Sequence, residues 1–201
     1  RMVPMIDSTT GNVKMQTVTI RGRQVQDTVF HKIPDFSLTD ENGKPANLSL
    51  VKGKIHIADF IFTRCPGQCP KMSKEMQRLQ EKFEKNPQVV FLSYTVDPEH
   101  DTPEVLKKYA QNLEADSNRW HFLTGAKKDI YHLALKGYFI TAKEEETNSQ
   151  ALEDRFVHTD KFVLVDTEGQ IRGFYSGVSQ LEMEKLVLET KILLHELENK
   201  L

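Results

Sequence analysis

The sequence is dominated by two strand-length apolar runs that flank one amphipathic helix. Residues 55–62 (IHIADFIF) and 89–96 (VVFLSYTV) are nearly continuously apolar, as expected of strands covered on both faces. A helix starting near Pro70 is predicted between them, because four apolar residues follow i, i+4, i+7, i+11 spacing. These are Met72, Met76, Leu79 and Phe83. Strand, helix and strand in this order predict a unit whose two strands run parallel.

More elements follow the second run. Residues 102–104 (TPE) are typical of a helix start, since they supply a cap, a proline at the first position and an acid in the first turn. Residues 127–137 are expected to form a shorter helix that ends at Gly137. The mostly polar residues 141–156 are expected to form a mobile loop.

Two hairpins and a long helix complete the pattern. Residues 161–165 and 170–175 flank a turn sequence, and an earlier hairpin is expected around residues 40–43 (DENG). Ser179 stands three residues before an acid, which is a capping box for a final helix. This order predicts an α/β, thioredoxin-like fold, in which helices flank a central mixed sheet that carries an N-terminal hairpin extension.

The chain is expected to divide into an N-terminal tail or stalk, residues 1–30, and one thioredoxin-like domain, residues 31–201. Its 201 residues suit one compact domain, at roughly 100–200 residues per domain. In the tail, alternation around Val18, Ile20 and Val25 could add an edge strand. The net charge of -2 gives no electrostatic reason to expect nucleic acid, and no uncharged run approaches the ~20 apolar residues of a membrane span.

Cys65 and Cys69 are the only two cysteines, and they follow the first apolar run directly. A disulfide framework in a small secreted domain would use more cysteines, and a bond between residues four apart closes too short a loop to stabilise the chain much. Ligands gather at the carboxyl ends of strands in open α/β sheets, and helix amides there favour thiolate over thiol. The pair therefore indicates chemistry, although two buried small apolar residues are the alternative.

Asp59 lies inside the first apolar run, six residues before Cys65. A carboxylate in such a strand is costly unless it has a partner. It could be a buried proton acceptor for a thiol, with its pKa raised by burial. Alternatively, it lies at the edge of the strand and bonds to backbone or to a lysine.

His158 is the histidine best placed to join the thiols. It precedes the strand at 161–165, which in a thioredoxin-like sheet runs antiparallel to the strand before Cys65 and so starts at the same edge. Two thiolates and one imidazole suit copper, as Cu(I) or Cu(II). A surface histidine is the alternative.

The other histidines have simpler interpretations. His100 also lies at the carboxyl end of a strand, but Asp101 and Thr102 beside it look mainly like helix caps, which favours a structural role. The remainder are His31 in the tail, His56 in the buried strand, and His121, His132 and His195 in or near helical stretches.

Thioredoxin-type disulfide oxidoreductases have a cis-proline opening the strand that faces their cysteines. All eight prolines of this chain lie at or before Pro103, and the corresponding residues are 157–159 (VHT). The missing ring leaves room beside the sulfurs and puts a metal-binding side chain there, which favours metal binding over simple thiol exchange.

Taken together, these residues resemble the Sco/SenC family, thioredoxin-like copper proteins of cytochrome c oxidase assembly. The resemblance covers about residues 31–196. It rests on residues 34–38 (PDFSL), 59–63 (DFIFT), the Cys-Pro pairs at 65–66 and 69–70, residues 97–98 (DP) and 101–103 (DTP), and His158.

The resemblance implies that Cys65, Cys69 and His158 bind copper and that the protein helps load the binuclear copper centre of an oxidase. Its implied partners are the copper-site subunit of cytochrome c oxidase and another copper chaperone or thiol reductant. It also implies a location in the bacterial cell envelope facing the periplasm, or in the mitochondrial intermembrane space, with an N-terminal membrane anchor that this sequence lacks.

Two functions remain open. A copper metallochaperone would hold copper with the reduced thiols and His158 and release it by ligand exchange. A thiol-disulfide oxidoreductase would use the same thiols, with Asp59 assisting proton transfer, to reduce cysteines of the oxidase subunit. A peroxidase is disfavoured, because Ala58 and Phe62 stand where peroxiredoxins place Pro and Thr, and zinc is disfavoured because a fourth strong ligand is not evident.

Overall fold

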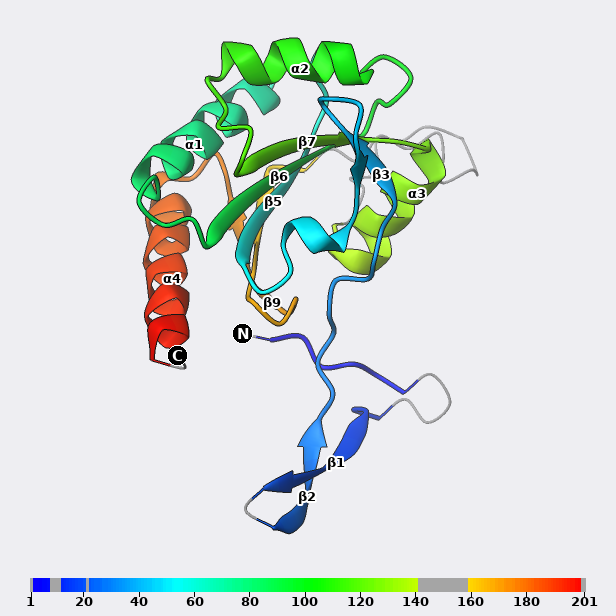
Figure 1. The fold of residues 1–201 in the computed structure, drawn as a ribbon, viewed down its shortest axis with the longest axis vertical. Helices are drawn as coiled ribbons and strands as arrows, with labels where there is room; N and C mark the ends of the chain where they lie inside the picture. Colours follow the sequence, from blue (N-terminus) through cyan, green and yellow to red (C-terminus); the bar gives the residue numbers. More distant parts are fainter. Residues whose placement is uncertain (1, 8–11, 21, 141–158, 200–201) are drawn as a thin grey trace.

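The structure is a computed structural model that describes residues 2–7, 12–20, 22–140 and 159–199 (Figure 1). Its centre is a seven-stranded sheet with the order β4-β3-β7-β6-β5-β8-β9. β5 pairs parallel with β6 and β6 with β7, whereas β8 runs antiparallel to β5. The strands are β3 (Leu38–Asp40), β4 (Pro45–Ala46), β5 (Ile55–Ile61), β6 (Val89–Thr95), β7 (Trp120–Thr124), β8 (Lys161–Val165) and β9 (Ile171–Ser176).

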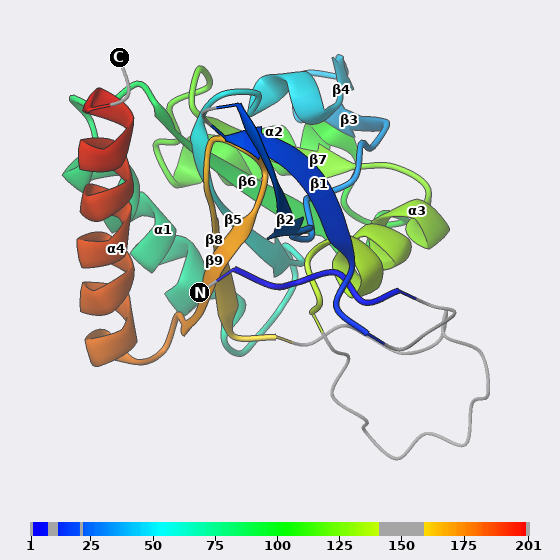
Figure 2. The same cartoon turned by 90° about the horizontal axis from the view of Figure 1, so that it is seen from below.

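Helices cover both faces of this sheet. Figure 2 shows α1 and α4 on one side and α3 on the other. Apolar residues of α1, α2 and α4 share one buried cluster, while residues of α3 and the turn after it belong to a second. The predicted thioredoxin-like α/β fold is therefore confirmed. The helices are α1 (Cys69–Lys82), α2 (Pro103–Asn112), α3 (Lys127–His132), which continues as a π-helix over Leu133–Gly137, and α4 (Gln180–Glu198).

β7 is a strand that the sequence pattern does not predict. It contains His121, which is expected in or near a helical stretch and lies instead within a strand, a few residues before α3. The strand has only five residues and is buried on both faces, which leaves no alternation to recognise. Tertiary contacts define it instead, because it lies between β6 and β3 and its Phe122 amide donates to the buried carboxylate of Glu41 at 3.0 Å.

The N-terminal residues form a hairpin of their own. β1 (Met15–Ile20) and β2 (Arg23–Thr28) pair antiparallel, with Val18 opposite Val25. This two-stranded sheet is separate from the central sheet, so an edge strand of the central sheet is the wrong interpretation, whereas a hairpin extension is confirmed. Figure 1 shows the hairpin standing away from the main body. A domain boundary after residue 30 stays a prediction.

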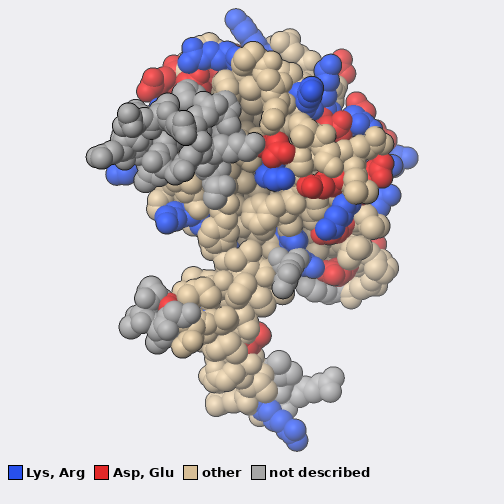
Figure 3. All heavy atoms as spheres, turned by 180° about the vertical axis from the view of Figure 1, so that it is seen from behind, with Lys and Arg blue, Asp and Glu red and all other residues tan. Residues whose placement is uncertain are grey.

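Charged side chains of both signs are intermixed on the face in Figure 3, mostly over the main body rather than over the hairpin. That face offers no broad field of one sign to a charged partner. Within the described ranges, the helices are all too short or too polar to cross a bilayer.

Three buried polar side chains form a hydrogen-bonded series in the core. The His56 ring Nε2 lies 3.1 Å from the Tyr138 hydroxyl, which lies 2.9 Å from the Tyr94 hydroxyl. His56 Nδ1 has no hydrogen-bond partner among the described residues. Burial lowers the pKa of His56 from 6.5 to about 3, so the folded protein keeps this ring neutral.

This shift makes His56 a source of acid sensitivity. The unfolded chain binds a proton at His56 below about pH 6.5, whereas the folded chain binds it only below about pH 3. The free energy of unfolding that is present above pH 6.5 is therefore lost as the pH falls from 6.5 towards 3. The slope of the unfolding free energy from this one group approaches about 1.4 kcal/mol per pH unit.

We expect the His56→Gln variant to lose this component, because glutamine can still bond to Tyr138 but does not titrate. Urea unfolding of both proteins over a series of pH values measures the slopes, with the exposed His132→Gln as the control. Parallel stability curves for wild type and His56→Gln would contradict the assignment.

Candidate functional site

The two cysteines lie where the chain leaves β5 and enters α1. Cys69 is the first residue of α1 and is 6% exposed, whereas Cys65 is half-buried in the preceding loop. The loop turns tightly, since the Cys65 amide donates to the Phe62 carbonyl at 3.2 Å and the Met72 amide donates to the Gln68 carbonyl at 3.0 Å. Both thiols are free, and they interact with each other through a side-chain hydrogen bond.

The two thiols differ in acidity. Burial acts to raise the pKa of Cys65, but hydrogen bonds from the Cys69 backbone and thiol and from the backbone of Gly67 and Gln68 outweigh it and lower this pKa. Burial raises the pKa of Cys69 to about 12, and the nearby Cys65 and Asp59 add to the increase. Amides at the start of α1 therefore favour a thiolate at Cys65, as predicted. For Cys69 that expectation is wrong, because burial dominates.

Asp59 lies fully buried within β5, where its Oδ1 accepts a hydrogen bond from the Ser93 hydroxyl at 2.6 Å. Its Oδ2 has no hydrogen-bond partner among the described residues. Burial raises the pKa of Asp59 to about 7, although the bond from Ser93 acts in the opposite direction. The alternative interpretation is a carboxylate at the strand edge, bonded to backbone or to a lysine. That position is wrong, since Asp59 lies in the middle of buried β5, bonds to Ser93 and raises the pKa of Cys69.

Sequence reasoning misses two residues of this environment. Ser93 lies on β6 beside Asp59 and also accepts from Trp120 Nε1 at 3.0 Å. Tyr109 on α2 contacts the Ser73 hydroxyl at 2.8 Å. Burial raises the pKa of Tyr109 to about 12, and the charges of Asp59 and both thiols contribute, so the ring lies close to the site. A polar residue inside the run 89–96 is the signal that could have identified Ser93.

Asp101 connects the cysteine loop to the end of the neighbouring strand. Its fully buried carboxylate accepts from the Thr63 amide at 3.1 Å, the Thr63 hydroxyl at 2.5 Å and the Thr95 hydroxyl at 2.5 Å. It also accepts from His100 Nδ1 at 2.9 Å. The predicted capping role belongs to Thr102, whose side chain accepts from the Val105 amide. Asp101 itself does not cap α2, so that expectation is wrong.

His158 lies outside the described residues, as do the predicted loop at 141–156 and Val157. Among the residues that the structure does describe, His, Cys, Asp and Glu side chains form no cluster of three or more that could hold a metal ion. The predicted ligand set of two thiols and His158 therefore stays a prediction.

The strand that follows His158 starts where predicted. β8 pairs antiparallel with β5, with Val163 opposite Ala58, so its first residues lie at the carboxyl end of β5. The Asp160 carbonyl accepts from the Gly177 amide at 2.6 Å, which ties the start of β8 to the end of β9. The chain thus enters β8 at the edge of the sheet that carries the cysteine loop.

Gly177 brings this part of the sheet against α1. A Cβ at this position would lie 2.6 Å from Phe162 Cε2 and 3.1 Å from Met72 Cγ. Met72 is three residues after Cys69 on the same helix. A side chain at residue 177 would therefore clash with Phe162 of β8 and would also press on Met72 of the cysteine-bearing helix.

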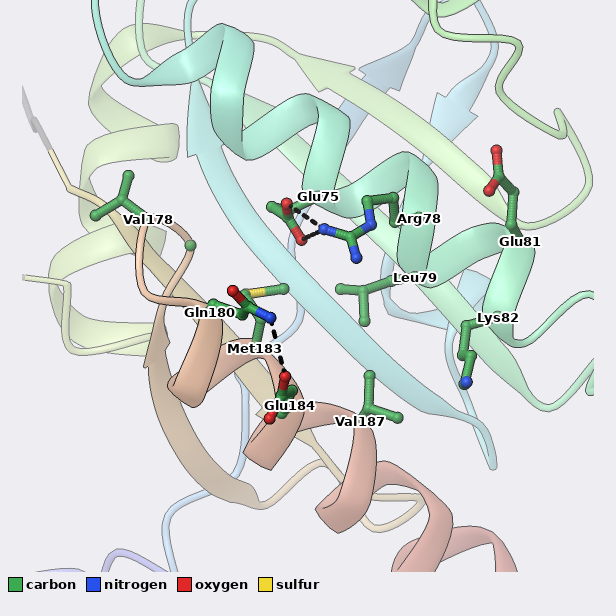
Figure 4. Close-up of a pocket in the computed structure, with 11 residues that line it drawn as sticks. Glu75, Arg78, Leu79, Glu81, Lys82, Val178, Gln180, Met183, Glu184 and Val187 are labelled. Atoms are coloured by element: carbon green, nitrogen blue, oxygen red, sulfur yellow. Dashed lines mark hydrogen bonds and ion pairs between the residues drawn. The ribbon is translucent and has the colours of Figure 1, made fainter.

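A groove of about 660 Å³ lies between α1 and α4 (Figure 4). Leu79, Met183 and Val187 form its floor, and Glu75 pairs with Arg78 at 2.8 Å along its rim. Neither cysteine lines this groove. It is a separate feature of the surface from the thiol site.

Comparison with known proteins identifies the family of this chain. The model of the SCO1/SenC family matches residues 24–192. The SCO1 protein homolog of Bacillus subtilis (strain 168) is 34% identical over 172 residues, which cover 85% of this chain and 86% of that protein.

Two solved structures are also similar. BsSco, a member of the Sco family of cytochrome c oxidase assembly proteins in which a disulfide switch was identified, shares 33% identity at a TM-score of 0.68, over 81% of this chain and 93% of that one. Bradyrhizobium japonicum ScoI, solved with copper bound, shares 27% identity at a TM-score of 0.59, over 80% of this chain and 98% of that one. The family match and these relatives show that the chain belongs to the SCO1/SenC family.

Proposed function

We propose that this protein is a copper metallochaperone of cytochrome c oxidase assembly, which binds copper through Cys65, Cys69 and His158. The observation that carries the proposal is the meeting of two elements at one sheet edge. The free thiols lie at the carboxyl end of β5, and β8, which begins three residues after His158, starts at that same edge. The copper-bound relative ScoI supports the choice of metal.

The residues present fit copper as cargo. Two thiolates and an imidazole are soft donors that suit Cu(I) and tolerate Cu(II). Metal binding requires deprotonated thiols, and Cys65 is already favoured as a thiolate by the amides around it. Cys69 is buried and protonated, and Asp59 is the nearby carboxylate that can accept its proton. The chain itself contributes two sulfurs of unequal accessibility, so that copper can dissociate from one sulfur before the other.

The partner that we propose is the copper-site subunit of cytochrome c oxidase, with another copper chaperone or a thiol reductant acting upstream. BsSco, a member of a family of oxidase assembly proteins, supports this choice. The location that we propose is the bacterial cell envelope rather than the mitochondrion, because the similar SCO1 protein homolog comes from a bacterium.

We expect the reduced protein to bind about one equivalent of copper and to show thiolate-to-copper charge-transfer absorption when loaded with Cu(II). Cys65→Ser and His158→Ala should each weaken binding by at least about tenfold, because each removes a ligand. Anaerobic titration against a competing chelator measures this, with the exposed His132→Ala as the matched control. Wild-type affinity in both ligand variants would overturn the proposal.

A second function, thiol-disulfide exchange with cysteines of the oxidase subunit, is favoured by the unequal thiols. Cys65 is more accessible and more acidic, so it suits the attacking thiolate, and Cys69 is buried beside it and suits the resolving thiol. The bond formed between them would release two electrons to the partner's disulfide, which becomes two thiols. The disulfide switch of BsSco supports this second role.

We expect iodoacetamide to modify Cys65 before Cys69. Each unit of pKa changes the thiolate fraction about tenfold below the pKa, so the difference in rate should exceed that factor at neutral pH. Mass spectrometry of partly alkylated protein measures the order, and Cys65→Ser and Cys69→Ser identify each modified thiol. Equal rates, or faster reaction at Cys69, would remove the basis for this role.

A further inference from the structure

His100 and the cysteine loop are held by the same carboxylate. Asp101 is fully buried and accepts from both the amide and the hydroxyl of Thr63, which lies two residues before Cys65. It also accepts from His100 Nδ1 at 2.9 Å, and that nitrogen lies 3.5 Å from the Thr63 hydroxyl. The imidazole is therefore fixed directly beside the loop that carries Cys65.

The same bond leaves the far nitrogen of His100 free for a metal. Since a carboxylate accepts from Nδ1, the ring proton lies on that nitrogen and the Nε2 lone pair is unprotonated in the neutral ring. The side chain is 41% exposed, so the ring is accessible from solvent. Carboxylate-oriented imidazole is the usual arrangement of a metal-binding histidine, because the second bond fixes the ring and raises its basicity.

The surroundings of His100 favour an arriving cation. Residues 97–104 contain four carboxylates and no Lys or Arg. Arg64 of the cysteine loop is bound to Asp97 at 2.7 Å, so its charge is offset. Cys65 is half-buried and Cys69 is 6% exposed. The exposed His100 ring is therefore more accessible to an incoming metal than either thiol.

We propose that His100 is an accessory copper ligand, which receives the incoming metal through Nε2 and passes it to Cys65 by ligand exchange. Asp101 is the positioning residue for both groups. The inference rests on the proposed copper-binding function and adds to it a point of entry. No electron is transferred in this step, because the Cys65 thiolate replaces the imidazole as a donor on the same ion.

The test is the rate of copper loading into the reduced full chain. Stopped-flow absorption follows the thiolate-to-copper charge-transfer band after mixing with the bis-glycine complex of Cu(II). We expect His100→Gln to load about tenfold more slowly than wild type, on the scale at which losing such an auxiliary group acts at metal sites. Freeze-quenched samples of wild type should show an early nitrogen-coordinated Cu(II) signal in electron paramagnetic resonance, which precedes the band and is absent from His100→Gln.

Two further variants separate metal binding from a structural role. His100→Arg keeps an N–H donor for Asp101 but offers no lone pair, so it should load as slowly as His100→Gln. His132→Gln removes an exposed histidine on α3 and should load like wild type. If His100→Arg loads at the wild-type rate, the entry role of His100 is overturned, whereas the proposed copper-binding function is not. If wild type itself develops no charge-transfer band, the proposed function fails, and the entry ligand falls with it.

Discussion

The arrangement of this protein depends on β5 lying between a parallel and an antiparallel neighbour. All seven residues of the strand are buried, so its register with β6 and β8 is fixed by packing on both faces. Because β6 runs with β5 and β8 runs against it, the end of β5, the end of β6 and the start of β8 meet at one edge. The cysteine loop, Asp101 and the entry to β8 come from three separate parts of the chain, and this pairing is what gathers them.

Burial and helix amides act against each other at the two thiols. Cys65 and Cys69 are only four positions apart in the chain. Cys65 lies in a loop and accepts several amide hydrogen bonds, whereas Cys69 begins α1 and its side chain is buried in the core. The same helix start therefore makes one sulfur more acidic and leaves the other a thiol. An unequal pair of this kind suits stepwise chemistry, in which one sulfur reacts or exchanges first and the other follows.

Much of the fold can be predicted from local sequence patterns. The predictions that fail do so where tertiary contacts determine the structure. The runs at 55–62 and 89–96 and the stripe of α1 are predictable because their periodicity is strong. β7 is not, since its five residues owe their conformation to neighbouring strands. Asp59 and both cysteines stand out by chemistry in an apolar context. Asp101 does not, because a residue beside a capping threonine has an obvious local role, and only the fold shows that it bonds to Thr63 instead.

A substitution at Gly177 would affect this site without changing a cysteine. Gly177 lies outside the cysteine loop, but a Cβ there would lie against Phe162 on β8 and Met72 in the first turn of α1. A methyl group at this position would crowd Phe162 and Met72 at once and so disturb the packing of β8 against α1. An alanine at residue 177 would therefore loosen the packing beside the cysteine-bearing helix while both cysteines stay chemically unchanged.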